Sequence, residues 1–364
     1  MYFLYFSPSQ TYPVLTTMIK GKLKTIALLF ITTFSLSAVA QQDPQFSQNM
    51  NNKLFVNPAY AGMNDGICGY MLGRHQWSGF EGRPETYVFG AHGTFTTPVI
   101  NMRSGGGLTI VGDALGQQHF FGLKGQYSLH VPLKFVGGNP GHLGIGVSVG
   151  LLQFSLGNNW RATEDYFSDP SIPDEGYSQG GFDMDMGLYY QTYLAQDRKL
   201  YFGVSMAHLN GIEFSGNGNR LDSLFPNDPR VSAWDTRFKM YRHIYVMAGF
   251  DYPIPGNELF VLKPSVFVKS DAVTAQFDVN LNVEWNNFIW GGVGYRAVDA
   301  AVVMAGLKSA VPGIPGTFTA GYSYDVTTSR INKGSGGSHE IFLQYCFKLK
   351  PQPPVRQHRN VRFL

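Results

Sequence analysis

Charged residues and long apolar runs are both scarce in this sequence, and each shortage argues against a class of protein. Charged residues make up 15% of the chain, whereas an ordinary soluble domain has about 25%. Apolar residues are plentiful, but beyond residue 40 no stretch approaches the roughly 18 to 20 consecutive apolar residues that a membrane-spanning helix needs. The sequence therefore fits neither an ordinary soluble domain nor a helical membrane protein.

The N-terminus is the exception, because an apolar run from Thr25 to Ala40 follows three lysines and ends in Ala-Val-Ala. A basic region, a short apolar core and a small-residue exit are typical of a secretory signal peptide. We therefore expect residues 1–40 to be a signal peptide, cleaved between Ala40 and Gln41, with Met18 as an alternative start. An uncleaved single-span anchor is the other interpretation of this run.

The mature chain would have no formal net charge. The whole chain carries +3, and residues 1–40 hold three lysines and no acid. The last 17 residues, 348–364, form a basic tail without an acid, which leaves a slightly acidic body. Nucleic acid is not expected as a partner, since that usually requires a basic stripe on the fold itself.

Strict alternation of apolar and polar residues is the clearest pattern in the chain. It runs unbroken from Gln276 to Trp285, and it recurs from Phe182 to Tyr190 and from Leu143 to Leu151. Ten alternating residues are typical of a transmembrane strand with one face toward lipid and the other toward a wet lumen. In the third run the inner face is mostly Gly and Ser, which indicates a crowded wall or a close-packed plug inside.

Fourteen such runs predict an all-β fold, a transmembrane antiparallel β-barrel over residues 68–347. A non-strand segment, residues 41–67, precedes the barrel, and the tail 348–364 follows it. An even strand count is what single-chain bacterial barrels require. The predicted strands are 68–77, 86–96, 106–114, 119–131, 141–156, 181–194, 198–208, 239–252, 258–270, 272–285, 287–298, 300–309, 316–325 and 338–347.

Loop lengths test this count. With both ends of the barrel periplasmic, the connections 195–197, 253–257 and 286–287 should be short periplasmic turns, and they are short. The two long connections, near 157–180 and 209–238, then both fall on the external side. The first of these is acidic, and its plain interpretation is a solvated loop.

Groups that could mark an enzyme or a metal site are present but poorly placed for chemistry. Ser148 lies in the letters of a nucleophile elbow, Gly-Val-Ser-Val-Gly, but in mid-strand rather than on the sharp turn that the elbow needs. The nine histidines are scattered, and no ligand spacing typical of a metal site occurs. The inward-facing acids are Asp183, Asp185, Asp278 and Glu284. We expect them to pair with arginines such as Arg296 in the lumen wall rather than to form a catalytic or calcium site. We therefore expect no enzyme, no cofactor and no metal.

The two cysteines and the N-terminal segment each leave two interpretations open. Cys68 opens the first predicted strand and Cys346 nearly ends the last, so in a closed barrel they are neighbours at the periplasmic rim. They form either a disulfide that pins the seam or two unpaired thiols. The segment from Asp43 to Gly62 has aromatic residues among many amides but no strand period. It is a plug or a periplasmic contact if ordered, and otherwise a flexible leader.

A colinear set of motifs spans residues 42–347 and resembles the PorP/SprF family of Bacteroidota outer-membrane proteins. The set includes Gln-Asp-Pro-Gln-Phe-Ser-Gln from residue 42, Asn-Pro-Ala-Tyr-Ala-Gly from residue 57 and Gly-Tyr-Ser-Tyr-Asp from residue 321. The basic tail and Cys346 depart from the pattern. The motif residues singled out are Asp43, Pro44, Gln45, Phe46, Ser47, Gln48, Asn57, Pro58, Ala59, Tyr60, Gly62, Arg74, Trp77, Tyr295, Arg296, Tyr324 and Asp325.

The resemblance implies an outer-membrane component of the type IX secretion and gliding machinery. The partners that it implies are outer-membrane lipid, the periplasmic and outer-membrane components of that machinery, and a large surface adhesin with a sorting domain. The resemblance does not decide between a role in general secretion and a role dedicated to one adhesin. A porin-like diffusion or uptake channel is the rival function, and it requires an open lumen.

Overall fold

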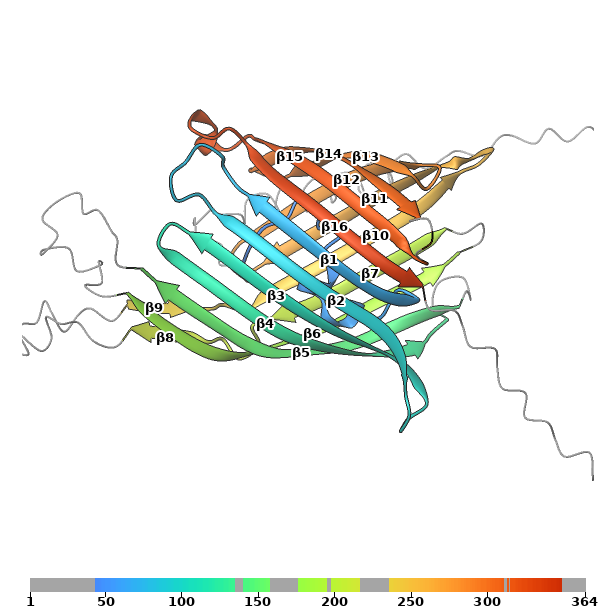
Figure 1. Cartoon of the computed structure of the whole chain (residues 1–364), viewed down its shortest axis with the longest axis horizontal. Coiled ribbons are helices and arrows are strands. Elements are labelled where there is room, and N and C mark those ends of the chain that lie inside the picture. The colour runs from blue at the N-terminus through green and yellow to red at the C-terminus, as the bar shows by residue number, and fades with distance from the viewer. Residues whose placement is uncertain are drawn as a thin grey trace, which may run out of the picture. The chain divides into compact units, whose positions relative to one another are not determined.

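The protein, in a computed structural model, is a closed β-barrel of fourteen antiparallel strands (Figure 1). The structure describes residues 43–134, 140–157, 176–194, 198–216, 236–310, 313 and 315–348. The predicted fold class and strand count are confirmed. The barrel strands are β1 (Gly66–His75), β2 (Glu85–Thr97), β3 (Met102–Leu115), β4 (Gln118–Pro132), β5 (Gly141–Leu156), β6 (Tyr177–Tyr193), β7 (Lys199–Ala207), β10 (His243–Ile254), β11 (Asn257–Ser270), β12 (Ala275–Trp285), β13 (Ile289–Arg296), β14 (Ala300–Ala310), β15 (Thr317–Thr327) and β16 (Ser338–Lys348).

The strands form because apolar and polar side chains alternate between two different surroundings. In β12, Phe277, Val279 and Leu281 are 40–55% exposed on the outer wall. Asp278 and Asn280, between them, are buried inside. This arrangement reverses the usual burial of a soluble protein and is what a lipid-facing wall requires. None of the helices in the described part of the chain is long and apolar enough to cross a membrane.

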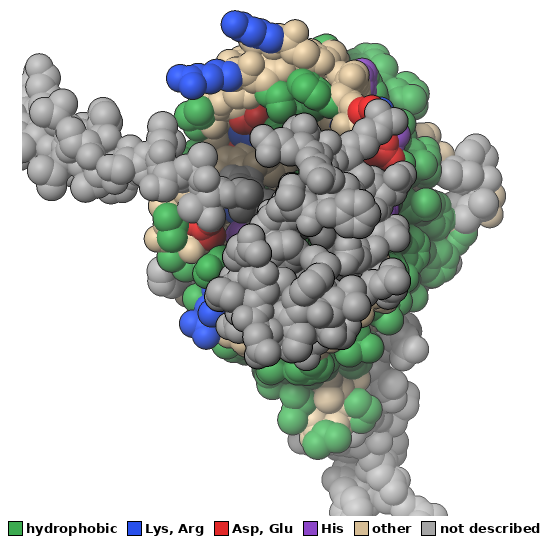
Figure 2. All heavy atoms as spheres, turned by 90° about the vertical axis from the view of Figure 1, so that its left-hand side faces the viewer, with side chains coloured by type: hydrophobic (Ala, Val, Ile, Leu, Met, Phe, Trp, Pro, Cys, Tyr) green, Lys and Arg blue, Asp and Glu red, His purple; other side chains and the backbone are tan. Residues whose placement is uncertain are grey.

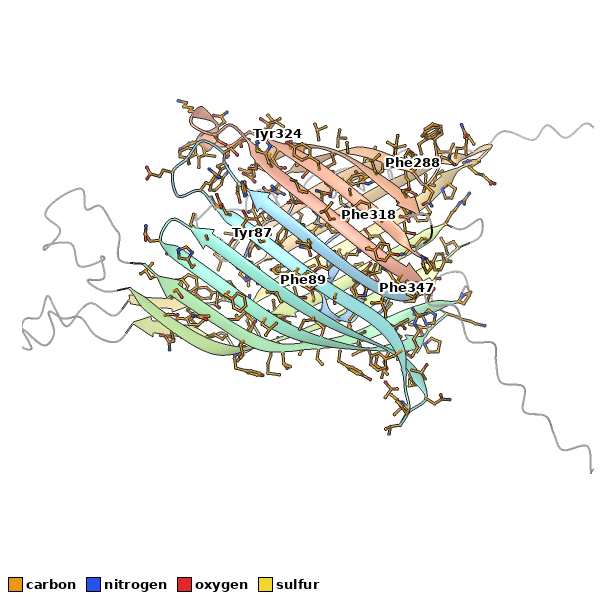
Figure 3. All side chains as sticks on the ribbon, viewed as in Figure 1. Tyr87, Phe89, Phe288, Phe318, Tyr324 and Phe347 are labelled. Carbon is orange, nitrogen blue, oxygen red and sulfur yellow. A yellow bond between two sulfur atoms is a disulfide. The ribbon has the colours of Figure 1, made fainter. Side chains whose placement is uncertain are left out.

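Aromatic side chains stand on the outer wall toward both ends of the barrel (Figure 3). Tyr87 and Tyr324 lie toward one end, and Phe288 and Phe347 lie toward the other. Aromatic girdles at the two membrane interfaces are a general feature of outer-membrane barrels. The wall between them therefore has the layout of a membrane-spanning band.

The two ends of the barrel differ in their connections. We call the end where β1 begins and β16 ends the terminal end, and the other the loop end. At the terminal end β10 turns into β11 through two residues, with Gly256 at a φ of +81°, and Asn286 and Asn287 turn β12 into β13 at positive φ, which Asn tolerates. The predicted turn 195–197 lies outside the described residues.

One prediction at the loop end was wrong. The connection predicted as loop 209–238 contains a two-stranded sheet, β8 (Glu213–Gly216) with β9 (Thr236–Lys239), and the strand predicted from residue 239 begins instead at His243. Four-residue strands are too short for their alternation to be read. Here they are held by tertiary contacts, since Phe214 and Phe238 stack against Phe154 of β5.

The seam between β1 and β16 closes the barrel. The two strands pair over ten residues, from Gly66 with Lys348 to His75 with His339. Cys68 and Cys346 are register partners in this pairing, with Cα atoms 4.0 Å apart, and a disulfide joins them. Its sulfur atoms face the interior, where Cys68 is fully buried.

We expect loss of this disulfide to weaken the barrel. A bond between residues 278 positions apart stabilises a fold by roughly 2–5 kcal/mol in the loop-entropy view. Cys68→Ser should therefore lower the temperature at which the purified barrel unfolds in detergent, read from the heat-dependent shift of its band in a gel. Reductant should lower the wild-type temperature to the same value and leave the variant unchanged. Two alkylatable thiols in unreduced wild-type protein would contradict the expectation.

Candidate functional site

A non-strand segment fills the interior of the barrel. Residues 43–65, called here the luminal segment, include α2 (Lys53–Val56) and η1 (Pro58–Tyr60) and lie within the ring of strands (Figure 1). The segment begins near the loop end, where Asp43 contacts residues that follow β7 and open β10. It finishes at the terminal end, where Asn64 contacts Cys68 at the start of β1. It thus passes through the barrel from one end to the other.

Asp43 anchors the start of the segment. His208 Nε2 lies 3.0 Å from its Oδ1, Tyr245 donates to its Oδ2, and Lys269 donates to its backbone carbonyl. Burial alone would raise the pKa of Asp43, but the attraction of His208 and His243 outweighs burial and holds it well below the usual value. The carboxylate is therefore charged and neutralised in place.

His208 connects this anchor to the wall of β6. Its Nδ1 lies 2.8 Å from Oδ2 of Asp183. Lys124 of β4 lies 2.6 Å from Asp183 and 2.8 Å from Asp185. Burial alone would lower the pKa of His208, but Asp43 and Asp183 raise it to about 9. The imidazolium therefore serves as a fixed cation between two carboxylates.

A second anchor holds the next turn of the segment against β16. The backbone N–H groups of Ser47 and Gln48 donate to the two oxygens of Glu340, at 2.8 and 2.7 Å. The Ser47 hydroxyl donates to Asp325 at 2.6 Å. Backbone donors that would otherwise be unpaired in a buried place are thus satisfied by carboxylates.

Two arginines complete this second anchor. Arg74 of β1 reaches Asp325 at 2.8 Å and Glu340 at 3.2 Å. Arg296 of β13 reaches Asp325 at 3.0 Å and Asp278 at 3.3 Å. All five side chains are buried. A buried charge is stable only when it is paired and hydrogen-bonded, and here each one is.

The middle of the segment is packed against glycines. A Cβ on Gly146 would lie 2.2 Å from the backbone nitrogen of Ala59, and one on Gly105 would lie 1.9 Å from the Ala61 carbonyl oxygen. Asn57 caps η1 by accepting from the Ala59 N–H and donates to the Leu188 carbonyl of β6 at 3.0 Å. The small residues on the inner face of β5 thus leave room for the backbone of the luminal segment.

The structure brings most of the motif residues into this interior. Ser47, Gln48, Arg74, Arg296 and Asp325 meet in the second anchor. Five more motif residues lie along the segment: Pro44, Phe46, Pro58, Tyr60 and Gly62. The ring of Phe46 packs against the ring of Phe55, and the backbone N–H of Gly62 donates to Nδ1 of His92. Gln45 donates to Gln276 at 2.7 Å.

Three motif residues lie outside this interior. Tyr295 is 56% exposed on the outer wall. Trp77 lies in the β1–β2 connection at a φ of +54°, and its backbone N–H donates to the Ser338 hydroxyl. Tyr324 donates to the Gly336 carbonyl in the β15–β16 connection. These three residues shape the wall and the loop end.

Sequence reasoning missed several residues of the two anchors. His208, Tyr245 and Lys269 were not singled out, although all are polar or amphipathic residues at or next to inner-facing strand positions. Alternation places a side chain on the inner face, but it does not say which segment of the chain that side chain meets. Asp278 was correctly expected to pair with Arg296.

The interior also contains the residues that were considered for catalysis or metal binding. Ser148 is buried in the middle of β5, away from any turn. Two groups of possible metal ligands gather around His208, namely Asp43 with His243 and Asp183 with Asp185. Sequence spacing did not predict them. Lys124 already lies between the two acids of the second group, and Lys269 lies against Asp43, so these carboxylates are balanced by protein cations.

The loop end presents a different surface. Figure 2 looks onto this end: hydrophobic side chains form the outer wall, and basic side chains stand at parts of the rim. The 3₁₀ helix η2 (Arg330–Lys333) carries exposed Arg330 and Lys333 there. The β8–β9 hairpin also lies at this end, with Tyr241 beside it half exposed.

Removing the charge of Glu340 should loosen the luminal segment. Glu340→Gln leaves the two arginines short of one carboxylate, and breaking a buried pair costs about 3–5 kcal/mol. We expect a lower denaturant midpoint of the barrel and faster protease cleavage within residues 43–65. Glu85→Gln is the control, because its ion pair with Arg83 is about one-third exposed and is worth less than about 1 kcal/mol. Equal effects of the two variants would contradict the anchoring role.

Comparison with solved structures finds other barrels at low sequence identity. A FadL homologue of Pseudomonas aeruginosa matches 82% of this chain and 94% of its own, at 10% identity and a TM-score of 0.49. The toluene transporter TodX of Pseudomonas putida gives the same coverage and identity at 0.46. The translocator domain of the autotransporter NalP of Neisseria meningitidis matches 79% of this chain and 89% of its own, at 15% identity and 0.41. No curated protein matches the sequence.

The comparison with family models is decisive. The model of the type IX secretion system membrane protein PorP/SprF matches residues 38–345, which include the luminal segment and, apart from the last three residues of β16, all the barrel strands. The chain therefore belongs to the PorP/SprF family of type IX secretion system membrane proteins.

Proposed function

We propose that this outer-membrane barrel is a docking component of the type IX secretion machinery, which supports secretion or surface attachment of sorting-domain-bearing proteins such as adhesins. Family membership supports the machinery and the membrane. The observation that favours docking over transport through the lumen is the luminal segment, held by buried ion pairs at two anchors. A barrel whose interior is occupied in this way works through its surfaces.

The loop end is the surface that we assign to the cargo or a partner barrel. The β8–β9 hairpin forms a separate two-stranded sheet there, and stacking of Phe214 and Phe238 on Phe154 fixes it to the wall. A rigid extension costs less ordering entropy on binding than a free loop. At the terminal end the basic tail 348–364, which lies beyond the described residues except for Lys348, would meet periplasmic machinery or anionic lipid.

Export fits the same arrangement. Cleavage between Ala40 and Gln41 would leave two residues before Asp43, which is buried inside the barrel. A short N-terminus suits this position, whereas an uncleaved leader of 40 residues would have to leave the barrel again. We therefore assign residues 1–40 to a removed signal peptide.

The rival function, a diffusion or uptake channel, makes an opposite prediction about conductance. In planar bilayers the wild-type barrel should conduct ions far less than a porin, because the luminal segment occupies the interior. Deletion of residues 43–62 should raise the conductance at least several-fold, provided that a heat-dependent gel shift shows a folded barrel. Porin-like conductance of the wild type would favour the channel.

Replacing the hairpin should separate cargo handling from barrel assembly. With residues 213–239 exchanged for a short Gly-Ser linker, His208 and Met240 remain, so the barrel should still reach the outer membrane. We expect surface display of its cargo to fall at least ten-fold, measured by proteomics of surface-labelled cells. Loss of one surface protein indicates a dedicated adhesin, and loss of all sorting-domain proteins indicates general secretion.

The matched control replaces residues 133–140, a connection at the terminal end, by the same linker. It should leave cargo display intact. If the control and the hairpin variant lose cargo equally, or if neither does, the assignment of the loop end is wrong.

A further inference from the structure

A polar cavity of about 280 Å³ lies in the barrel, between the luminal segment and the wall. Met50, Asn51 and Lys53 of the segment form one side of it. The other lining residues stand close to the terminal end: Lys199 is the first residue of β7, Glu284 is next to last in β12, and Lys308 is third from last in β14. The cavity is therefore reached from the terminal end.

Four lysines and two carboxylates line this cavity. Glu284 lies 2.7 Å from Lys263 and 3.3 Å from Lys308, and Asp251 lies 3.9 Å from Lys263. Glu284 is thus engaged by both of these lysines, whereas Asp251 lies near Lys263 and is the register partner of Lys199 in the β7–β10 pairing. In their charged forms the four lysines exceed the acids by two positive charges.

Lys53 and Lys199 are the two lysines that have no acid within ion-pair distance, although Asp251 lies opposite Lys199 in the sheet. Among the described residues neither forms an ion pair. Lys53 is 92% buried, and its Nζ lies 3.4 Å from both the Tyr189 hydroxyl and the Tyr201 ring centroid. Lys199 lines the same cavity, and an anion beside these two lysines would offset the repulsion between their charges.

One of the lining residues also carries a buried, uncharged donor. The indole N–H of Trp290, a lining residue, is buried and has no acceptor among the described residues. A buried donor without an acceptor costs about 1–3 kcal/mol. The volume is well above the 10–15 Å³ or so that one water needs, so the cavity has room for an organic anion.

We propose that this cavity is a binding site for a small dianion, a dicarboxylate or a phosphate, held by Lys53 and Lys199. With all four lysines charged, the net charge of +2 on the lining matches two negative charges. The chain's own tail does not fit, because residues 348–364 are basic and the cavity would repel them. The site lies at the opposite end from the surface assigned to cargo, so it is independent of that proposal.

Unfolding temperature and calorimetry of the full mature barrel in detergent test the site. Succinate and inorganic phosphate are the probes, with sodium chloride at matched ionic strength as the reference. We expect one or both probes to raise the unfolding temperature above the chloride value, because a ligand of the folded state stabilises it. Lys199→Gln should weaken probe binding about ten-fold or more, the size of one lost charged hydrogen bond.

Two further variants separate binding from general stability. Lys134→Gln removes an exposed lysine at the same end, outside the cavity, and should leave binding unchanged. Glu284→Gln removes a competing carboxylate and should tighten probe binding even if it lowers the unfolding temperature of the unliganded barrel. The proposal is overturned if neither probe exceeds chloride, or if Lys199→Gln and Lys134→Gln bind the probes equally.

Discussion

The need to satisfy charges that face inward governs this structure. A strand that crosses a membrane must place its polar residues on the lumen side, and fourteen strands bring many buried acids and bases into one small space. Isolated, each such charge would be strongly destabilising. The barrel solves this with its own N-terminal residues. Their backbone N–H groups and the Ser47 hydroxyl complete the hydrogen bonding of Glu340 and Asp325, and the Asp43 carboxylate pairs with His208.

The same constraint explains why the interior and the wall fit so closely. Glycines on the inner faces of β3 and β5 leave room for the backbone of the luminal segment, and η1 lies where a side chain on Gly146 would otherwise stand. A diffusion channel keeps its lumen open to water. Here the strands carry the small residues that the backbone of the luminal segment requires.

The alternation of apolar and polar residues predicted the strands well, because each residue's polarity depends only on whether it faces lipid or the lumen. It placed β5 at 141–156 and put Asp183 and Asp278 on the inner face. It could not name their partners, because Ser47 and Glu340 are 293 residues apart and nothing local connects them. The β8–β9 hairpin was missed for a similar reason, since its four-residue strands depend on the rings of Phe154, Phe214 and Phe238. The cluster around His208 likewise exists only in three dimensions.

The seam has a consequence for how the barrel is assembled. The luminal segment touches β1, β15 and β16 on one side and β5, β6 and β7 on the other, and its packing against Gly105 and Gly146 leaves no room for it to slide in later. The closed sheet encloses the segment, and the seam between β1 and β16 completes the ring. A slip of two residues in that pairing would set Cys68 opposite Gln344 instead of Cys346. Only the correct register brings the two sulfurs together, so the disulfide requires first and last strands that are paired in this register.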